Sequence, residues 1–383
     1  MKQKKHICLI SGKRGGFGAM LPTMELINSS SEMKLSVIAT DQHLYEKFGK
    51  TIDELKSKIQ LTCSIDLEQA GDSNADRGEA VGVCLQKMSR ILEKIKPDIL
   101  LVIGDRGEVF ASCIAAHNLR IAIAHVQGGD ISGSLDEPVR HAITKLAHIH
   151  FPSTELSASR ILKMGEEPWR IHTVGDTHID QIFSSNPAPE HLVAKKYSIT
   201  ADKPTLLVLQ HSDSTVSNDS YIQMQETMNA VCSLGLRTIV VYPCSDQGFE
   251  GIMRSIENFR NFSHISIHKN IPAEEFIALQ KLASCFVGNS SAGLIEAPYF
   301  GLPTVNVGDR QIGRERCANV IDVPYDHHLI KTAIDKSLYD KSFRACCSKI
   351  RAPFGDGQAC RKIVDILENT SLGSKLLNKR MTY

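Results

Sequence analysis

The chain has 383 residues, with 44 Lys and Arg against 43 Asp and Glu and a formal net charge of +1. At this length two domains are expected rather than one core. The balanced charge excludes a broad basic surface for nucleic acid or an anionic membrane, so any anion site must be local. No apolar run approaches the roughly eighteen residues of a membrane span, and Ile7 to Ile10 is too short for a secretion signal. The eleven cysteines are scattered without C-x-x-C spacing, which is typical of reduced thiols in a cytoplasmic protein.

In chain order, short apolar runs typical of buried strands alternate with helix-like segments. The runs of the first half are Ile7 to Ile10, Leu35 to Ile38, Ile99 to Ile103, Ile121 to Val126 and Ile149 to Phe151. Those of the second half are Thr205 to Leu209, Thr238 to Tyr242, His264 to Ile267, Cys285 to Val287 and Thr304 to Val307. This alternation predicts an α/β fold with two Rossmann-like domains, each a parallel sheet covered by helices on both faces.

The two series are separated by a small, polar and proline-rich stretch from Ser184 to Pro189. Such a stretch predicts a boundary, and we place the hinge between about 176 and 203. A second breaker at 352–357 precedes a helix expected from about Ala359 to Leu367. We therefore expect an N-terminal domain over 1–180, a C-terminal domain over 181–355, and a segment 356–383 whose helix packs back on the first domain.

The most informative stretch for function is 285–296. The strand Cys285 to Val287 runs into Gly-Asn-Ser-Ser and then into a helix-like segment, which places the hydroxyls of Ser290 and Ser291 at a positive helix N-terminus. Such a helix start favours an anion, most naturally a diphosphate. Glu296, about one and a half turns further on, is placed to accept hydrogen bonds from a diol such as a ribose. The pattern predicts a nucleotide site, with an ordinary capped helix as the alternative.

Charged side chains follow two strands of the predicted first domain. Arg14 lies in a glycine-rich turn after the first strand and could reach a phosphate. Asp105 and Arg106 follow the strand Ile99 to Ile103, at the edge where open α/β sheets bind ligands. Asp105 is therefore a candidate acid/base and Arg106 a candidate anion ligand. A local salt bridge is the alternative for this pair.

Three more carboxylates, Asp130, Asp136 and Glu137, follow the next strand. Clustered carboxylates raise one another's pKa values, which suits proton transfer to or from carbon. Pro138 marks the first turn of a helix that begins here. Either Asp136 or Glu137 could therefore serve only as a helix cap.

In the second half, His211 follows the strand Leu206 to Leu209 and could donate to a leaving phosphate, although a lone histidine is more often structural. Arg310 and Arg314 follow the strand Thr304 to Val307 as anion ligands or salt-bridge partners. The first-half histidines lack a zinc-like spacing with acids, so we expect no metal site and assign packing or hydrogen-bonding roles to most of His125, His141, His148 and His150.

Together these segments resemble the UDP-N-acetylglucosamine 2-epimerase family, specifically its hydrolysing branch, which supplies N-acetylmannosamine for sialic acid synthesis. The resemblance covers nearly the whole chain. Its most specific pieces are Gly-Asp-Arg at 104–106, the run at 128–148, Gly-Asn-Ser-Ser at 288–291 and Gly-Asp-Arg-Gln-Ile-Gly-Arg-Glu at 308–315. It implies the GT-B architecture, with two Rossmann-like domains facing a central cleft, UDP held mainly by the second and the sugar facing the first. It also implies a homodimer or homotetramer, with a nucleotide sugar as substrate and no cofactor.

The resemblance also assigns roles to individual residues. The UDP-binding residues it implies are Arg14, Arg106, His211, Ser290, Ser291, Glu296 and Arg310. The resemblance matches Asp105 and Asp136 to the family's acid/base carboxylates and His211 to its histidine beside the phosphates, and the carboxylate cluster adds Asp130 and Glu137 as catalytic candidates. The sugar-side candidates are His43 and Gln127. Many relatives have Glu at positions 127 and 130. Because a neutral Gln127 cannot accept a proton, proton transfer is expected to move to Asp130, Asp136 or Glu137.

The expected activity is conversion of UDP-N-acetylglucosamine and water to N-acetylmannosamine and UDP, by elimination to a glycal and rehydration. The alternative substrate is UDP-2,4-diacetamido-2,4,6-trideoxyglucose, which would serve legionaminic acid synthesis. A catalytically inactive UDP-sugar-binding protein and a GT-B glycosyltransferase are further alternatives. A non-hydrolysing epimerase is disfavoured because that branch resembles Gly-Asp-Thr and His-Val-Glu-Ala-Gly where this chain has Gly-Asp-Arg and His-Val-Gln-Gly-Gly.

Overall fold

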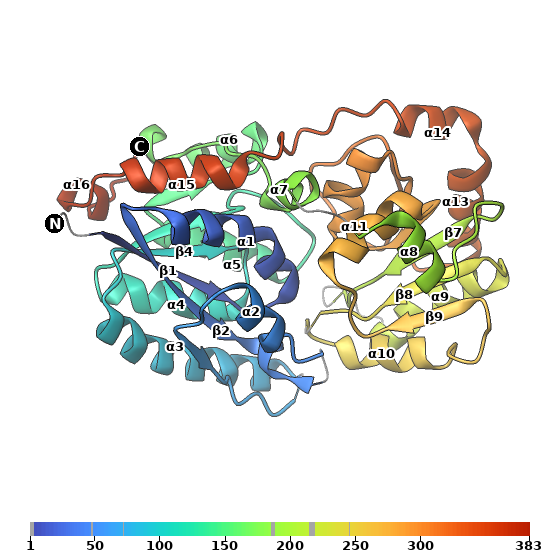
Figure 1. The fold of residues 1–383 in the computed structure, drawn as a ribbon, viewed down its shortest axis with the longest axis horizontal. Helices are drawn as coiled ribbons and strands as arrows, with labels where there is room; N and C mark the ends of the chain where they lie inside the picture. Colours follow the sequence, from blue (N-terminus) through green and yellow to red (C-terminus); the bar gives the residue numbers. More distant parts are fainter. Residues whose placement is uncertain (1–3, 47–48, 72, 185–187, 214–218, 245) are drawn as a thin grey trace. The chain divides into compact units, whose positions relative to one another are not determined.

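The computed structural model describes residues 4–46, 49–71, 73–184, 188–213, 219–244 and 246–383. The chain divides into two compact units (Figure 1). Unit 1 comprises 1–130, 135–184 and 353–383, and unit 2 comprises 131–134 and 185–352. The predicted linker Ser184 to Pro189 falls at the step from unit 1 to unit 2, and its residues 185–187 lie outside the described part of the chain.

Unit 1 is built on a parallel six-stranded sheet of order β3-β2-β1-β4-β5-β6. Its strands are β1 (Lys5–Ser11), β2 (Met33–Thr40), β3 (Cys63–Ile65), β4 (Ile99–Ile103), β5 (Ala122–Val126) and β6 (Ile149–Phe151). Alternate side chains of a strand enter different cores: Ile7 and Leu9 of β1 join one apolar cluster, and Cys8 and Ile10 join the other. Both faces of the sheet are therefore buried, which is why the strands are continuous apolar runs in the sequence.

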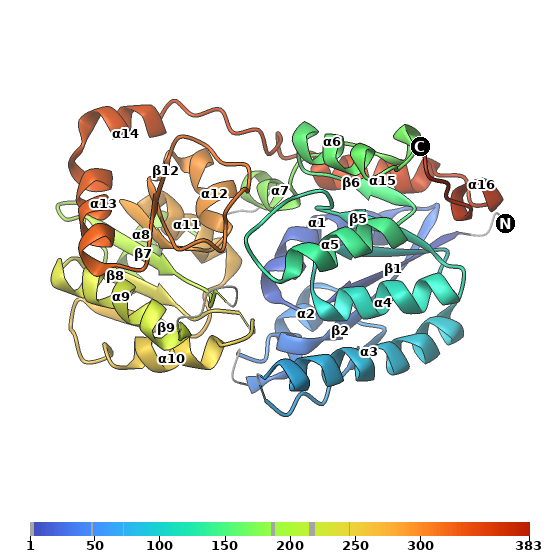
Figure 2. The same cartoon turned by 180° about the vertical axis from the view of Figure 1, so that it is seen from behind.

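Helices cover each face of the first sheet. One face packs on α1 (Arg14–Ser29), α2 (Ile52–Lys58), α15 (Ala359–Asn369) and α16 (Ser374–Leu377). The other packs on α3 (Asn74–Ile95), α4 (Gly107–Asn118) and α5 (Asp136–Leu146), which lie on the same side of the sheet in Figure 2. The remaining elements of the unit are α6 (Glu155–Lys163), α7 (Thr177–Ser184) and the 3-10 turns η1 (Asp41–Leu44) and η3 (Pro168–Arg170).

The C-terminal segment belongs to unit 1 because α15 is fastened to α7. The carboxylate of Asp180 in α7 accepts hydrogen bonds from the backbone N–H groups of Ala359 and Cys360, at 2.9 and 2.5 Å. These are two of the donors that a helix start leaves without an intrahelical partner. The side chains of Ile363 and Leu367 on α15 are then fully buried in the core shared with α1.

Unit 2 repeats the architecture, with sheet order β12-β11-β10-β7-β8-β9. Its strands are β7 (Thr205–Leu209), β8 (Arg237–Val241), β9 (Ile265–His268), β10 (Cys285–Gly288), β11 (Thr304–Val307) and β12 (Val320–Val323). Its helices are α8 (Glu190–Lys196), α9 (Ser220–Ser233), α10 (Phe249–Glu257), α11 (Ala273–Leu282), α12 (Ala292–Ile295), α13 (His327–Tyr339) and α14 (Lys341–Cys347), with the 3-10 turn η4 (Ala297–Phe300). Numbered within its own unit, each sheet has the Rossmann strand order 3-2-1-4-5-6.

The predicted fold class, α/β with the GT-B arrangement of two Rossmann-like domains, is confirmed. All ten predicted strands are present. Two further strands, β3 and β12, were not predicted, because an exposed polar residue, Ser64 in β3 and Asp322 in β12, interrupts each apolar run. Within the described residues, no helix has the length and apolar character needed to cross a membrane.

Candidate active site

The carboxyl edge of the first sheet carries a cluster of carboxylates around one buried arginine. Arg140 of α5 is 3% exposed and ion-pairs with Asp105, which follows β4. It also donates to the backbone carbonyl of Asp130, at 2.9 Å. Burial alone would lower the pKa of Arg140, but the charges of Asp105, Asp130 and Asp136 outweigh burial and raise it. One guanidinium thus ion-pairs with Asp105, holds the backbone of Asp130 and interacts with the charges of Asp130 and Asp136.

Asp130 and Asp136 reach this cluster from different elements. Asp130 accepts a hydrogen bond from the Ser157 hydroxyl of α6 at 2.6 Å. Gly129 before it has a φ of +79°, and a Cβ there would collide with the Ser157 carbonyl, so only glycine allows this approach. Asp136 is the first residue of α5, four residues before Arg140 and hence on the same helix face.

Glu137 has a further side-chain contact within α5. Its carboxylate lies 3.7 Å from the imidazole of His141, one turn along α5. The helix-cap alternative for Asp136 and Glu137 does not apply, because the N-cap position of α5 is Leu135. Both acids instead lie in the first turn, where a negative charge is stabilised by the helix dipole.

The two first-domain arginines that we assigned to phosphates are engaged within unit 1. Arg106 is 7% exposed and ion-pairs with Asp41 at 2.7 Å and with Glu108 at 2.9 Å. The alternative of a local salt bridge therefore holds for Arg106, but its partners are Asp41 and Glu108 rather than Asp105. Arg14 forms an ion pair with Glu54 of α2 at 3.1 Å.

His43 is fully buried in η1. Its two ring nitrogens lie 2.9 Å from the Ser11 hydroxyl and 2.7 Å from the Thr51 hydroxyl. Burial, aided by the Arg14 charge, lowers its pKa to about 4, so the ring is neutral near pH 7. A contact between His43 and a sugar would require the ring to exchange one of these hydroxyl partners.

The other first-half histidines are held by hydrogen bonds, as expected. Fully buried His125 donates from Nε2 to the Gly104 carbonyl at 2.8 Å, and burial lowers its pKa to about 3. His148 accepts from the Ile123 backbone N–H at 3.1 Å, and fully buried His150 meets Glu166 at 3.0 Å. These side chains hold β5 and β6 and the segments that follow them in place.

Gln127, just after β5, contacts two residues that the sequence analysis did not select. Its amide nitrogen lies 2.9 Å from a carboxylate oxygen of Asp176 and 3.1 Å from Nδ1 of His178. Asp176 is 1% exposed. Gln127 has a φ of +64°, a left-handed conformation that costs a non-glycine residue about 1 kcal/mol or more. Such a backbone outlier is the kind of signal that marks functional sites.

In unit 2 the carboxyl edge of the sheet is organised by a buried amide. The side chain of Asn289 accepts from the backbone N–H of His211 at 2.7 Å and donates to the His211 carbonyl at 2.9 Å. The Asn289 backbone carbonyl accepts from Gln311 at 2.8 Å and from Arg310 at 3.4 Å. Asn289 is fully buried and links the segments that follow β7, β10 and β11. The sequence analysis named its motif but gave this residue no role.

The helix start after β10 is shorter than expected. Helix α12 covers only Ala292–Ile295, with Ser291 at its N-cap, and Glu296 is its last flanking residue before η4. Pro298 in η4 has no backbone N–H with which to continue an α-helix. The Ser290 hydroxyl accepts from the Ala292 N–H at 3.4 Å, and Glu296 accepts from Gln280 at 2.8 Å.

His211 lies beside Cys244 and close to Asp246. Nδ1 of His211 accepts from the Cys244 backbone N–H at 3.2 Å and lies 3.1 Å from the Cys244 sulfur. Within the part of the chain that the structure describes, these three residues form a group whose ligand atoms all lie within 4.8 Å of one another, which could hold a metal ion. Asp246 is also ion-paired with Arg310, at 2.9 Å.

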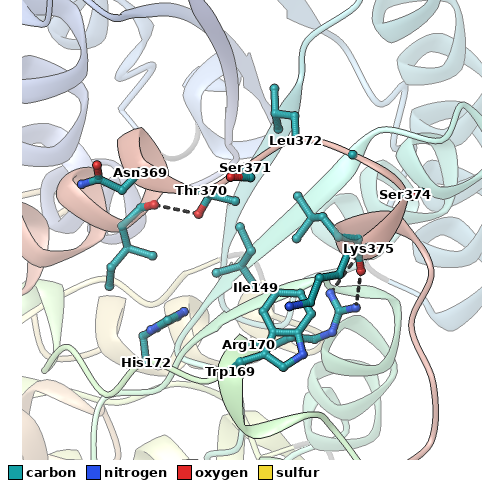
Figure 3. A pocket seen from close by; sticks show the side chains of 13 residues that line it. Ile149, Trp169, Arg170, His172, Asn369, Thr370, Ser371, Leu372, Ser374 and Lys375 are labelled. Atoms are coloured by element: carbon teal, nitrogen blue, oxygen red, sulfur yellow. Dashed lines mark hydrogen bonds between the residues drawn. The ribbon is translucent and has the colours of Figure 1, made fainter.

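Each unit has a cavity formed by its own residues. In unit 2, Arg314 lines a cavity of about 420 Å³ together with Asn306, Gly308, Asp309, Ile312, Gly313, Arg316 and Asp322. In unit 1, a cavity of about 640 Å³ lies between Trp169–Arg170 and the segment that joins α15 to α16 (Figure 3). This cavity borders Ile149 at the start of β6, so it is at the opposite sheet edge from the carboxylates. Arg170 donates there to the carbonyls of Lys375 and Leu376, which fastens the C-terminal segment.

Fold and site together define a GT-B-type α/β protein with a carboxylate cluster on one Rossmann-like unit and a candidate anion site on the other. The chain matches the family model described as UDP-N-acetylglucosamine 2-epimerase over residues 25–368, and it belongs to this family of enzymes. It is 33% identical to the UDP-N,N'-diacetylbacillosamine 2-epimerase (hydrolyzing) of Legionella pneumophila, over 99% of this chain and 100% of that protein.

Two further comparisons agree with this assignment. The UDP-N-acetylglucosamine 2-epimerase of Neisseria meningitidis is 30% identical, over 89% of this chain and 88% of that protein. The crystal structure of UDP-GlcNAc 2-epimerase from Neisseria meningitidis, bound to UDP-GlcNAc, superposes with a TM-score of 0.81, covering 95% of this chain and 100% of that one. At 18% identity that structural likeness concerns the fold alone.

Proposed function

We propose that this enzyme is a hydrolysing UDP-sugar 2-epimerase that converts UDP-N-acetylglucosamine and water to N-acetylmannosamine and UDP. The observation that carries the proposal is the gathering of Asp105, Asp130 and Asp136 around Arg140. Inversion at C2 requires groups that remove and return a proton at a carbon. Clustered carboxylates at a sheet's ligand-binding edge are suited to that task.

The reaction balances in two steps. In the elimination, the C2–H bond breaks as its electron pair forms the C1–C2 double bond, and the C1–O bond breaks with its pair leaving on UDP. In the addition, the oxygen of water bonds to C1 and a proton is delivered to C2 from the opposite face. Because the C2 proton is weakly acidic, the leaving of UDP must assist its removal, and electrostatic stabilisation of the departing diphosphate contributes on the order of 100-fold or more in rate.

Unit 2 is assigned the UDP half of the substrate. In this proposal Ser290, Ser291 and Arg310 contact the diphosphate, Glu296 the ribose and His211 the leaving oxygen. Arg310 would exchange its partner Asp246 for the diphosphate, and Glu296 would exchange Gln280 for the ribose hydroxyls. Arg14 and Arg106 are assigned supporting charge on the phosphate side, and Gln127 and His43 the sugar side.

A second substrate has a specific observation in its favour. The Legionella pneumophila relative, named for UDP-N,N'-diacetylbacillosamine, matches this chain over 99% of its length at 33% identity. That sugar is the 2,4-diacetamido-2,4,6-trideoxy analogue, so the two candidates differ at C4 and C6 rather than at the reacting C1 and C2. The same chemistry therefore applies to both.

Both nucleotides assayed side by side by proton NMR in deuterated water test the proposal. We expect release of UDP, and a free 2-epimerised sugar that carries deuterium at C2. The substrate with the higher kcat/KM is then the preferred one.

Three outcomes would contradict the proposal in different ways. Product without deuterium at C2 would exclude elimination through a glycal. Accumulation of the 2-epimeric nucleotide sugar would indicate a non-hydrolysing epimerase. UDP binding in calorimetry without release of UDP from either nucleotide would indicate a binding protein, and transfer to an acceptor other than water would indicate a glycosyltransferase.

A further inference from the structure

A buried histidine–carboxylate pair lies beside Gln127 in unit 1. The Asp176 carboxylate is 2.8 Å from Nδ1 of His178 and accepts the backbone N–H of His178 at 2.9 Å. It also receives the Gln127 amide at 2.9 Å and the Ser153 hydroxyl at 3.2 Å. These are the contacts of an acceptor surrounded by donors.

The donors around Asp176 favour one protonation state of the pair. A carboxylate that receives an amide, a hydroxyl and a backbone N–H functions as an anion, because an ionised carboxylate only accepts. Nδ1 of His178 lies 2.8 Å from Asp176 and 3.1 Å from the Gln127 amide nitrogen, which itself lies 2.9 Å from Asp176. We assign the shorter Nδ1 contact to donation from Nδ1–H to Asp176, with the Gln127 amide donating to the carboxylate. In that tautomer Nε2 carries the lone pair of the neutral imidazole and is the proton acceptor of the ring.

Gln127 fits this arrangement where a glutamate would not. Its amide N–H donates to Asp176, whereas a second carboxylate at the same place would face the Asp176 anion at hydrogen-bonding distance. The strained backbone of Gln127, with φ at +64°, brings the amide to that position. The neutral side chain at 127 thus stabilises the anionic partner of His178.

The pair is located at the edge of the sheet where the carboxylate cluster lies. Gln127 follows β5, Ser153 follows β6, and Asp176 follows an extended segment whose Ile171 pairs with His150 of β6. Asp130 of the Arg140 cluster is three residues from Gln127. The His178 side chain is 23% exposed while that of Asp176 is fully buried, so the imidazole is the more accessible member of the pair.

We propose that His178 is the group that removes the C2 proton, and that Asp176 and Gln127 position it. The inference rests on the 2-epimerase reaction proposed above and names its base. Nε2 takes the proton as the C1–O bond breaks, and Asp176 stabilises the imidazolium that forms. A carboxyl group of the Arg140 cluster then protonates C2 from the other face, and the proton lost by the attacking water restores that carboxyl group. The proton held by His178 is the one that the hydrolysis releases to solvent.

The pair differs from the Arg140 cluster in a way that suits this division of labour. Asp105, Asp130 and Asp136 share the positive charge of one guanidinium, so a carboxyl group of this cluster can hold a proton while Asp105 stays ion-paired with Arg140. Neutral His178 acquires charge on accepting a proton, and the adjacent anion compensates that charge. Removal and return of the proton on opposite faces need two different groups, and the sheet edge supplies both.

Three variants test the role through turnover. His178→Gln should lower kcat about 100-fold or more while the Kd for UDP stays within about two-fold. Exogenous imidazole should restore part of the turnover of His178→Gly, an effect that a purely structural role would not produce. The control is His172→Gln, a partly buried histidine that lines the cavity at the opposite sheet edge, and it should keep near wild-type turnover.

Nitrogen-15 NMR of the imidazole provides a readout that does not depend on activity. The His178 signal, identified by its loss in His178→Gln, should show the Nδ1–H tautomer in the wild type and a shift toward Nε2–H in Asp176→Asn. Wild-type turnover in His178→Gln, or an Nε2–H tautomer in the wild type, would overturn the assignment while leaving the 2-epimerase function in place. A wild-type enzyme that releases UDP from neither nucleotide would overturn both.

Discussion

The two carboxyl edges of this molecule have the same topology and different chemistry. Each follows a sheet of order 3-2-1-4-5-6, yet the edge in unit 1 is organised by ions and the edge in unit 2 by a neutral amide. Buried Arg140 gathers Asp105, Asp130 and Asp136, while buried Asn289 links the segments after β7, β10 and β11 through hydrogen bonds to backbone groups. The Rossmann order fixes where a ligand can bind, and the residues after each strand decide what is done to it.

The largest effect is expected from neutralising the ionic edge. Asp105→Asn and Asp136→Asn should each reduce kcat by at least about 100-fold, because an amide cannot carry the proton that C2 gains or loses. UDP affinity, measured by calorimetry, should change little, since neither Asp105 nor Asp136 is among the proposed UDP ligands. The control is Glu155→Gln, an exposed acid in the first turn of α6.

Wild-type turnover in both Asp variants would remove the cluster from catalysis. Asp105→Asn also leaves Arg140 without one ionic partner, so its melting temperature has to be measured as well. The melting temperature of Asp136→Asn is measured in the same way, because the charge of Asp136 also acts on Arg140. A loss confined to Asp105→Asn and matched by a lower melting temperature would indicate a structural role.

The strands of the two edges could be predicted from the sequence, but the partners of their side chains could not. Asp105 and Arg106 are adjacent in the sequence and suggest a local pair. The fold instead gives Asp105 to Arg140 of α5 and Arg106 to Asp41 and Glu108, because partner choice depends on helices that pack beside β4. The ten predicted strands were recognisable because both faces of each sheet are buried.

Two kinds of feature left no such signal. Strand β3 is Cys-Ser-Ile with an exposed serine at its centre, so it does not form a continuous apolar run in the sequence. Asp176 and His178 follow an extended segment with one isolated bridge to β6, at a place where we expected a hinge to begin. A glycine at 175, followed by an acid and a histidine before an apolar run, was the available hint.

As the pH falls, unit 1 should lose stability before unit 2. Burial lowers the pKa of His43, His148 and His150 to about 4 and that of His125 to about 3, and all four belong to unit 1. The unfolded chain binds protons at these histidines near pH 6.5 while the folded chain does not, so stability is full above pH 6.5 and is lost as the pH falls toward 4. At pH 5 each such histidine is expected to remove about 2 kcal/mol.

The single tryptophan makes this measurable, because Trp169 lies in η3 of unit 1. Urea unfolding followed by Trp169 fluorescence should shift to lower urea between pH 7 and 5. A reporter in unit 2, Phe262→Trp in a Trp169→Phe background, should shift less. His191→Gln, at an exposed site in α8, should leave both transitions unchanged. Equal shifts for both reporters would contradict the placement of acid sensitivity in unit 1.

A smaller effect is expected from removing the buried amide of Asn289. Asn289→Ala removes the side chain that bonds to the backbone N–H and carbonyl of His211, which should cost about 1–3 kcal/mol of stability. It should also weaken UDP binding, because His211 and the segment bearing Arg310 lose a common anchor. Calorimetry with UDP and urea unfolding measure the two effects. Asn258→Ala, on the exposed end of α10, is the matched control. Unchanged UDP affinity in a folded Asn289→Ala variant would show that Asn289 does not contribute to UDP binding.

The smallest effect, none at all, is expected on chelation. The group His211, Cys244 and Asp246 has the ligand types of a zinc site, but the Asp246 charge is already balanced by Arg310 at 2.9 Å. In the ligand-free enzyme a cation there would face that guanidinium. The elimination proposed above assigns stabilisation of the departing diphosphate to Arg310, Ser290 and Ser291, and it uses no metal. Turnover should therefore survive dialysis against EDTA. A loss of turnover that added Zn²⁺ reverses in the wild type but not in Cys244→Ser would show a metal centre in unit 2. The edge in unit 2 would then be ionic like the edge in unit 1.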